Sequence, residues 1–403
     1  MSNVVALLCD TIIFVVLPWL LWRATRRVIP IAVIPILIGI FLAVLHVPME
    51  DIGIPSVYGN KIGWLGVLFL AFNAGLEMHQ ESQHKDQDSS MGSSPLPRLI
   101  GGAIVAVIVP FLIGTALVYT FFLPLQGWRP AHAFNAVAAA SIGLCIAVSA
   151  LPVLLGIVRE LHPQHQPIGQ LALKIAIVDD VMLWIGLAVL QCISHGVFMP
   201  QDLLGNQSTA ILLLIALAAG GRWGTRHLRS PPQWLIWVIL CAYLFAGSWA
   251  SSQLGLHELI GAYLAGAMMP VAWVRRLPLE RLSQLSFIVL APLFFGHGGL
   301  KIDGDALTWP SILASLALVA IAITTKIGSL FIYPPASNLR PRQILSIGAL
   351  LQCKGLMEIV AATILHTQGL LSEIAFASLM ILAVISTTLT GPLFKLVAKT
   401  ESH

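Results

Sequence analysis

Two adjacent carboxylates, Asp179 and Asp180, interrupt an otherwise apolar stretch that runs from Lys174 to Leu190. An aspartate at the centre of a membrane helix costs roughly 2.5 to 3.5 kcal/mol on insertion scales, so two in succession are hard to retain unless they bind something. The pattern therefore indicates a site for a cation or a proton. The alternative is a buried pair neutralised by structural bases, which would require one base for each acid.

The chain has few bases at membrane depth, and one of them is Lys326, near the middle of the apolar segment 309–333. This lysine is far from both ends of the segment, and a buried ammonium group needs a carboxylate partner. We expect Lys326 to pair with one of the two aspartates and to leave the other to bind and release a cation. A lysine removed from water can also lose its proton, so Lys326 could itself take part in exchange. A purely structural ion pair is the alternative.

A second pair of charged residues, Lys354 and Glu358, lies four residues apart, so the two could neutralise each other on one helix. We favour a different role, in which they compensate the exposed ends of a broken helix. Lys354 would then lie near C-terminal carbonyl groups and Glu358 near N-terminal amide groups. Pro152 and Gly355 predict such breaks, because both free backbone groups in mid-membrane, where this is tolerated only beside protein or a water-filled cavity. A plain kink without a site is the alternative.

A short motif occurs twice, since Ser141-Ile142-Gly143 recurs as Ser346-Ile347-Gly348 seven predicted helices later. An odd separation reverses the direction of the chain across the membrane, so we predict two six-helix repeats of inverted topology. Inverted repeats whose broken helices cross near the midplane form the ion sites of many secondary transporters. The predicted organisation is a single transporter domain, residues 1–403, with a first repeat in 1–190, a linker and seventh helix in 191–232 and a second repeat in 233–403.

The composition predicts an all-α polytopic membrane protein. Of 403 residues, 57% are hydrophobic and only 10% are charged, and the mean hydropathy is +0.88, outside the range of soluble globular chains. The five cysteines have no ligand spacing, and we expect no cofactor and no nucleic-acid partner. A membrane helix needs about 20 apolar residues, and this criterion gives thirteen candidates: 4–22, 29–46, 61–78, 98–122, 133–158, 168–190, 208–221, 233–252, 257–273, 284–300, 309–333, 342–366 and 373–396.

The charges of the predicted loops give an orientation. With the N-terminus outside, most Lys and Arg residues fall on one side, which the positive-inside rule makes cytoplasmic, and only Lys61, Arg129 and Lys301 fall on the other. Positive residues follow the first apolar run and do not precede it, which favours a retained helix over a cleaved signal peptide. The C-terminus is then cytoplasmic, and we expect no regulatory domain in the short tail after Lys395. The polar segment 79–97 is predicted to be a cytoplasmic connector.

Six short motifs lie along the chain in this order: Gly75-Leu76-Glu77, Ser149-Ala150-Leu151-Pro152, Asp179-Asp180, the segment 255–266, Pro292-Leu293-Phe294-Phe295 and Lys354-Gly355-Leu356-Met357-Glu358. Together they resemble the monovalent cation:proton antiporters, particularly the second cation:proton antiporter family. The resemblance implies a core domain that carries the crossed helices and moves against a dimerisation domain, and it implies a homodimer. We expect an integral protein of a bacterial inner (plasma) membrane.

The resemblance also implies a role for single residues. Asp180 would alternately bind the cation and the proton, and Asp179 would pair with Lys326. Ser149 and nearby carbonyl groups of the broken helix would supply further oxygen ligands. The chain departs from the family at His297, where small hydroxyl or apolar residues are more usual, so the surroundings of this residue are expected to differ.

We therefore predict a secondary active transporter that exchanges a monovalent cation, sodium before potassium, for protons by alternating access. An alternative with the same architecture is a sodium-coupled symporter of an organic solute, which would need a larger polar cavity. An enzyme is not expected. An intramembrane aspartyl hydrolase normally places its two acids on facing helices, whereas adjacent residues of one helix point about 100° apart.

Overall fold

The structure is a computed structural model, and it describes residues 3–25, 31, 33–81, 96–130, 133–159, 161–195, 206–227, 231–274, 276, 284–302, 304 and 307–399. Every regular element within these residues is helical, which confirms the predicted all-α class. In chain order the elements are α1 (Asn3–Thr11), η1 (Ile12–Val16), α2 (Leu17–Ala24), α3 (Val33–Val44), η2 (Met49–Ile52), α4 (Val57–Glu81), α5 (Leu96–Leu117), η4 (Val118–Phe122), α6 (Asn135–Ala147), α7 (Leu151–Arg159), η5 (Pro163–His165), α8 (Gln166–His195), α9 (Asn206–His227), α10 (Gln233–Gln253), α11 (Glu258–Met268), α12 (Val271–Val274), η7 (Ser286–Leu290), α14 (Ala291–Leu300), α15 (Trp309–Ile332), α16 (Pro341–Leu350), α17 (Gly355–Thr367) and α18 (Glu373–Lys399).

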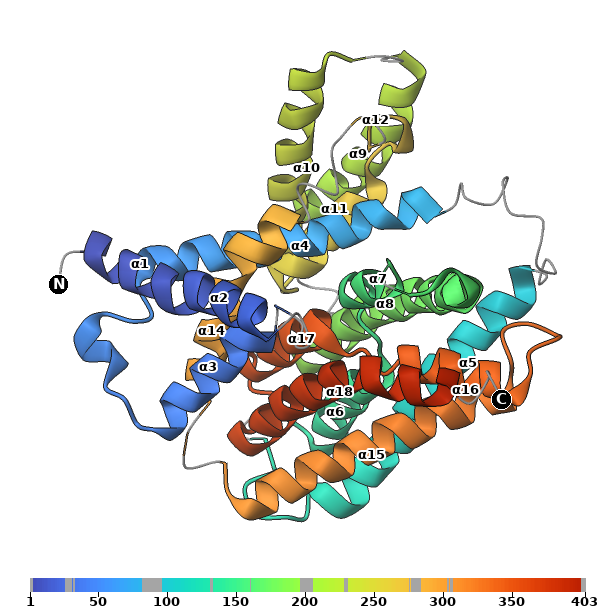
Figure 1. The fold of residues 1–403 in the computed structure, drawn as a ribbon. Helices are drawn as coiled ribbons and strands as arrows, with labels where there is room; N and C mark the ends of the chain where they lie inside the picture. The colour runs from blue at the N-terminus through green and yellow to red at the C-terminus, as the bar shows by residue number, and fades with distance from the viewer. Residues whose placement is uncertain are drawn as a thin grey trace. The chain divides into compact units, whose positions relative to one another are not determined.

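Each of the thirteen predicted apolar segments coincides with one helix or with a run of consecutive helices. Among the described residues, five helices are long and apolar enough to cross a membrane by length and composition: Asn3–Ala24, Pro97–Phe122, Gln233–Gln253, Trp309–Ile332 and Glu373–Ala398. Shorter apolar helices of 10–17 residues form several of the other predicted spans. The chain is thus an all-helical, multi-pass membrane protein (Figure 1).

The seventh predicted helix is longer than its apolar stretch. Hydropathy predicted residues 208–221, whereas α9 runs from Asn206 to His227. The difference arises because hydropathy marks only the apolar part, and a helix continues through polar residues such as Arg222 while its backbone hydrogen bonds continue. Most of the predicted connector at 79–97 lies outside the described residues, as does much of the loop before α9.

Two helices are interrupted in the middle of their apolar segments. Residues 148–150 separate α6 from α7, and residues 351–354 separate α16 from α17. In the first interruption Val148 is extended, with φ −86° and ψ 156°. Pro152 is the second residue of α7, where a missing N–H removes no helical hydrogen bond. Gly355 begins α17 with φ +54°, in the left-handed region that favours glycine.

The chain divides into two compact units, of which the first comprises Met1–Pro55, Ser89–Gly186 and Phe295–His403. It draws its segments from both predicted repeats. Within it α5 packs against α6 and α15, and α18 packs against α15, α16 and α17. Figure 1 shows α18 (red) beside α15 (orange). Both interrupted helices belong to this unit, so it contains the residues expected to form the ion site.

The second unit comprises Ser56–Asp88 and Leu187–Phe294. Its helix α11 packs against both α4 and α10, and glycines permit the close approach. A Cβ atom on Gly266 would collide with the carbonyl oxygen of Phe72 in α4, and one on Gly261 would collide with that of Gly247 in α10. The glycines of the sequence motif in α11 are therefore explained by backbone contact between helices.

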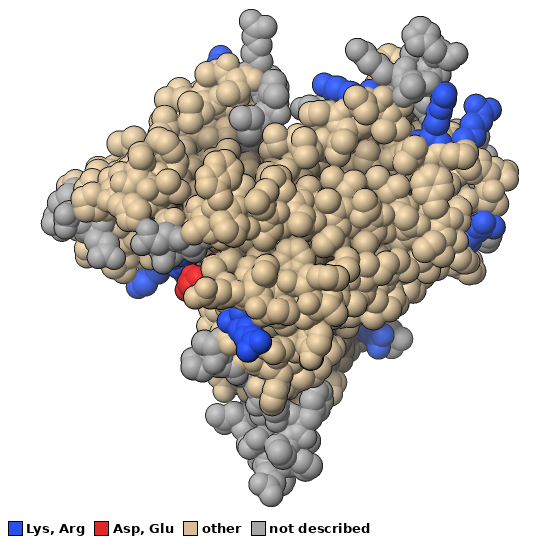
Figure 2. Space-filling view, turned by 90° about the horizontal axis from the view of Figure 1, so that it is seen from below, with Lys and Arg blue, Asp and Glu red and all other residues tan. Residues whose placement is uncertain are grey.

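The surface carries little charge over the face shown in Figure 2. Lys and Arg side chains (blue) are scattered near its margins, and most of the face between them is formed by uncharged residues. Large apolar side chains such as Phe41, Leu212, Phe245 and Leu313 are exposed. Such exposure is expected of a protein whose helices face lipid rather than water.

Gly355 provides a test of the second interruption. We expect Gly355→Ala to lower the thermal unfolding midpoint of the purified protein in detergent, because a left-handed backbone costs a non-glycine residue roughly 1–2 kcal/mol. The added Cβ would also lie 2.8 Å from Cγ2 of Val153 and 3.1 Å from Cβ of Ala150. The matched control is Gly328→Ala in α15, where a Cβ meets nothing within 4 Å. The control should leave the midpoint unchanged or raise it; an equal drop in both variants would contradict this account.

Candidate functional site

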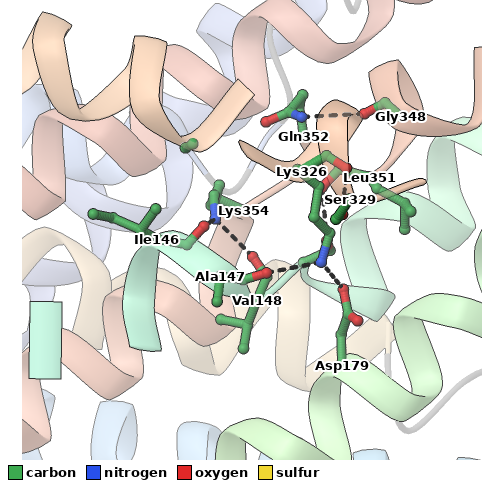
Figure 3. Close-up of polar contacts among 12 residues, drawn as sticks. Ile146, Ala147, Val148, Asp179, Lys326, Ser329, Gly348, Leu351, Gln352 and Lys354 are labelled. Carbon is green, nitrogen blue, oxygen red and sulfur yellow. Dashed lines mark hydrogen bonds and ion pairs between the residues drawn. The ribbon is translucent and has the colours of Figure 1, made fainter. Parts of the chain in front are cut away.

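The C-terminal end of α6 carries carbonyl groups that no helical N–H reaches. Such groups end every helix, but here the residues that carry them, Cys145 to Val148, are buried away from bulk solvent. The Lys354 side chain binds these carbonyl groups in place of water. Its Nζ donates to the carbonyl oxygens of Cys145 at 3.1 Å, of Val148 at 2.9 Å and of Ile146. The positive charge of the ammonium group is also favoured at the negative end of a helix dipole. Figure 3 shows Lys354 at this helix end.

Lys326 satisfies the one remaining carbonyl group of that helix end. Its Nζ donates to the carbonyl oxygen of Ala147 at 2.7 Å and to Oδ2 of Asp179 at 2.6 Å (Figure 3). Lys326 is 1% exposed and Asp179 is 0% exposed, so the pair is removed from water. Its hydrogen bond is of the short, charge-assisted kind, which is roughly twice as strong as a neutral one. A single ammonium group thus joins α15, α8 and the broken end of α6.

The two aspartates of α8 lie in different surroundings. Asp179 faces Lys326 through one oxygen, and its Oδ1 has no hydrogen-bond partner among the described residues. Asp180 is also buried, at 3% exposure, and it follows by one residue, so its side chain leaves the helix about 100° away. The pair of acids therefore presents one carboxylate to Lys326, and the second buried carboxylate leaves α8 in another direction.

Neutral groups, not lysines, satisfy the end of α16. The hydroxyl group of Ser149 donates to the carbonyl oxygen of Leu351 at 2.7 Å, and the next backbone N–H donates to that of Cys353 at 2.6 Å. Within the same interruption, the Gln352 side chain donates from Nε2 to the carbonyl oxygen of Gly348 at 3.2 Å. The two interrupted helices therefore meet at their breaks, but only the end of α6 is bound by ammonium groups.

Lys354 and Glu358 do not form an ion pair in the structure. Both are buried, yet neither carboxylate oxygen of Glu358 has a hydrogen-bond partner among the described residues. Glu358 lies in the first turn of α17, where a negative charge is favoured by the helix dipole. This arrangement resembles compensation of two helix ends more than direct neutralisation of one residue by the other.

The oxygen atoms around the breaks are suited to a hard cation. The Ser149 hydroxyl group donates its proton to the carbonyl oxygen of Leu351, so its oxygen still has lone pairs to offer. Carboxylate, hydroxyl and carbonyl oxygens are the ligands that hard cations prefer. Within the part of the chain that the structure describes, no group of three or more His, Cys, Asp and Glu side chains is placed to hold a metal ion.

Sequence reasoning overlooked two polar residues beside the breaks. Gln352 binds Gly348, as described above, and the Thr387 hydroxyl of α18 accepts a hydrogen bond from the N–H of Gly355 at 2.8 Å. An amide side chain two residues before Lys354 is a signal that could have identified Gln352. Thr387 gives no such signal, because Ser and Thr are common in membrane helices and often bond to their own backbone.

Crossed, interrupted helices with buried charges at the crossing define a class of protein, the secondary transporters that bind ions where half-helices meet. The model of one family, described as sodium/hydrogen exchanger, transmembrane, matches residues 11–399. The chain belongs to this family. It is therefore a member of a family of transporters and not an enzyme.

Sequence similarity to individual proteins supports the same family assignment. The chain is 29% identical over 356 residues to K(+)/H(+) antiporter 1 of Saccharomyces cerevisiae, covering 84% of this chain and 39% of that protein. It is 25% identical over 358 residues to Na(+)/H(+) antiporter NhaS4 of Synechocystis, covering 84% and 82%. Cation/H(+) antiporter 20 of Arabidopsis thaliana is 26% identical, with 83% and 40% covered. The chain thus spans about two fifths of the length of the yeast and plant relatives.

A solved structure shares the fold. The sodium proton antiporter MjNhaP1 from Methanocaldococcus jannaschii, determined at pH 8, superposes with a TM-score of 0.63 over 99% of both chains. The sequences are 15% identical, so the likeness shows the fold alone. It confirms the predicted sodium/proton antiporter architecture.

The Lys326 ion pair can be tested by stability. We expect Lys326→Gln to destabilise the folded protein by about 3–5 kcal/mol, since it leaves Asp179 buried without its cation. The double variant Asp179→Asn, Lys326→Gln should recover most of this loss, because amide groups replace both charges. Chemical denaturation in detergent measures the difference. Lys174→Gln, an exposed lysine of the same helix α8, is the matched control and should have little effect. A double variant as unstable as the sum of its single variants would contradict the pairing.

Proposed function

We propose that the chain exchanges a monovalent cation for protons and that its ion site is formed by Asp180 and Asp179, with sodium favoured over potassium. The observation that carries the proposal is the Asp179–Lys326 pair at the broken end of α6, directly beside a second buried carboxylate. Membership of the sodium/hydrogen exchanger family supports it. So do relatives named as K(+)/H(+), cation/H(+) and Na(+)/H(+) antiporters.

Asp180 is the proposed exchange carboxylate. When it is ionised it attracts the cation, and Ser149 together with carbonyl groups of the break supplies further oxygen ligands in place of water. When it is protonated its charge is lost and the cation leaves. Cation and proton therefore compete for one site, which opens to one side of the membrane at a time.

Lys326 and Asp179 have a supporting role in this scheme. Asp179 compensates the charge of Lys326, and Lys326 in turn binds the carbonyl oxygen of Ala147. A proton cycle on Lys326 would make exchange move net charge, whereas a permanently charged Lys326 would make it electroneutral. Lys354 and Glu358 compensate the helix ends, and Pro152 and Gly355 keep the helices interrupted.

The proposal also covers the orientation, the location and the assembly of the transporter. We infer that the N-terminus lies outside and the C-terminus in the cytoplasm, because Lys and Arg gather in the loops of one side. The proposed location is a bacterial inner (plasma) membrane, and the proposed assembly is a homodimer. The exposed apolar side chains of α1, η1 and α2, among them Leu8, Ile12 and Leu20, are available for lipid or for a second copy.

Replacement of Asp180 tests the exchange site. In proteoliposomes with a preset pH gradient, we expect sodium or lithium to dissipate the gradient through the wild type and to have no effect through Asp180→Asn, because the amide can neither ionise nor hold the cation by charge. Potassium is titrated in the same way to rank the ions. Glu373→Gln, an exposed carboxylate on α18, is the matched control and should transport normally.

Two results would overturn the proposal. Exchange that survives in Asp180→Asn would remove this residue from the site. No response of folded, inserted wild type to any of the three ions would reject cation:proton exchange and favour sodium-coupled uptake of an organic solute, which is then tested by adding candidate solutes.

Competition between cation and proton at one carboxylate also predicts how the half-saturating sodium concentration changes with pH. If one proton displaces one cation, each unit fall of pH in the acidic range should raise the half-saturating sodium concentration about tenfold. The initial rate of gradient dissipation, measured across sodium concentration at several pH values, gives this slope. A half-saturating concentration that does not change with pH would contradict a shared site.

A further inference from the structure

Gln352 carries an oxygen atom that nothing in the described part of the chain binds. The residue lies in the interruption between α16 and α17, and it is 0% exposed. Its Nε2 donates to the carbonyl oxygen of Gly348 at 3.2 Å, so the amide nitrogen is on that side. Oε1 lies on the other side of the amide group (Figure 3), and it has no hydrogen-bond partner among the described residues. A buried amide oxygen without a partner costs free energy, so a partner for Oε1 is expected.

The backbone on both sides of Gln352 contacts the first interruption. The carbonyl oxygen of Leu351 accepts the Ser149 hydroxyl group at 2.7 Å, and that of Cys353 accepts the N–H of Ala150 at 2.6 Å. All of these residues belong to the first compact unit. Gln352 is therefore held one residue away from two direct contacts with the segment that carries Ser149, a proposed cation ligand.

The carbonyl groups at the end of α6 are poor ligands for a further cation. The four carbonyl groups from Cys145 to Val148 each bind the ammonium group of Lys354 or Lys326. A second positive ion beside any of them would be repelled by that ammonium group, and the repulsion is stronger in buried surroundings than in water. Oε1 of Gln352 belongs to the same kind of amide dipole, but no ammonium group among the described residues binds it. It is therefore better suited to a cation than they are.

An amide oxygen also has the right chemistry for a monovalent cation. Hard cations take carboxylate, hydroxyl and carbonyl oxygens as ligands. In the proposed site, Asp180 and Asp179 supply negative charge from α8, and Ser149 supplies a hydroxyl group from the first interruption. Gln352 adds a neutral oxygen from the second interruption. A buried water molecule is the other partner that such an oxygen can have, and the two differ in what replacement of Gln352 does to cation binding.

We propose that Gln352 is a further ligand of the transported cation and that its amide oxygen contributes to the choice between ions. The inference rests on the proposed function, because it adds one oxygen to the site formed by Asp180, Asp179 and Ser149. Oε1 replaces one water molecule of the ion's hydration shell, and the bond from Nε2 to Gly348 keeps the amide group oriented. The bound cation then joins both interrupted helices, since its ligands come from each of them.

The first test removes the oxygen and keeps the length of the side chain. Gln352→Met is unbranched, and its thioether sulfur is a soft, poor ligand for a hard cation. In proteoliposomes at one alkaline pH, we expect the half-saturating sodium concentration to rise about tenfold, with a smaller change in the maximal rate. Gln352→Asn keeps the amide group but draws its oxygen back by one methylene group. It should raise the half-saturating sodium concentration less than Gln352→Met does, and it should favour the larger potassium ion relative to sodium.

The matched control is Thr387→Val, which disturbs the same interruption without touching the proposed ligand. The Thr387 hydroxyl accepts the N–H of Gly355 at the start of α17, so its loss should lower the thermal midpoint. The half-saturating sodium concentration should nevertheless stay at the wild-type value. An equal rise in Thr387→Val and Gln352→Met would show a merely structural role and overturn the inference. No rise in Gln352→Met would overturn it as well and would leave water as the partner of Oε1.

A second measurement follows binding without transport. Sodium that binds the folded protein raises its thermal midpoint in detergent, and choline chloride at equal ionic strength is the reference. The sodium-dependent rise should be present in the wild type and clearly smaller in Gln352→Met. A wild type that shows this rise without any exchange would reject only the proposed function, and the role of Gln352 as a ligand would stand. A wild type with neither sodium-dependent stabilisation nor exchange would overturn both. If Gln352→Met does not fold, Gln352→Asn decides, and an unchanged sodium dependence and ion order would overturn the inference.

Discussion

The broken end of α6 imposes the constraint on which the site depends. Interrupting a helix within a membrane leaves its last carbonyl groups without amide partners or water, and unsatisfied groups there cost several kcal/mol each. Lys354 and Lys326 together bind the four carbonyl groups from Cys145 to Val148. The lysines that look anomalous in apolar segments are therefore required by the backbone of another helix.

Binding a helix end with ammonium groups creates a second requirement, since two buried positive charges need negative ones nearby. Asp179 meets it for Lys326 through a direct contact, and Glu358 lies at the start of the helix that follows Lys354. The end of α16 needs no such compensation, because Ser149 and Gln352 are neutral donors. The two breaks, which come from similar sequence motifs, are thus satisfied by different chemistry: ammonium groups bind the carbonyl groups at the end of α6, and neutral donors bind those at the end of α16.

Much of this arrangement could be predicted from the sequence, and the remainder shows what spacing cannot reveal. The helices follow from hydropathy, and a lysine in mid-membrane requires an acid, so a contact between Lys326 and one of the two aspartates was expected, and the family resemblance implied that this would be Asp179. The binding of both lysines to one helix end was not expected, because no local sequence pattern indicates which carbonyl groups of another helix lack an amide partner. The bonds of Ser149 to Leu351 and of Asp10 to His297 join residues 202 and 287 positions apart. No periodic pattern in the sequence links the two members of either pair, so their contact is seen only in the folded chain.

The same contacts support the proposal that Asp180, and not Asp179, is the carboxylate that exchanges its charge. Protonation of Asp179 would leave the ammonium group of Lys326 buried without an anion, and removing one partner of such a pair costs about 3–5 kcal/mol. Lys326 also binds Ala147, so the cost would fall on the helix end as well. Lys326 contacts Asp179 and not Asp180, so a change in the charge of Asp180 does not remove the bond between Lys326 and Asp179. A transporter that must release its ion in every cycle works best when the acid that changes charge is not the acid that stabilises the break.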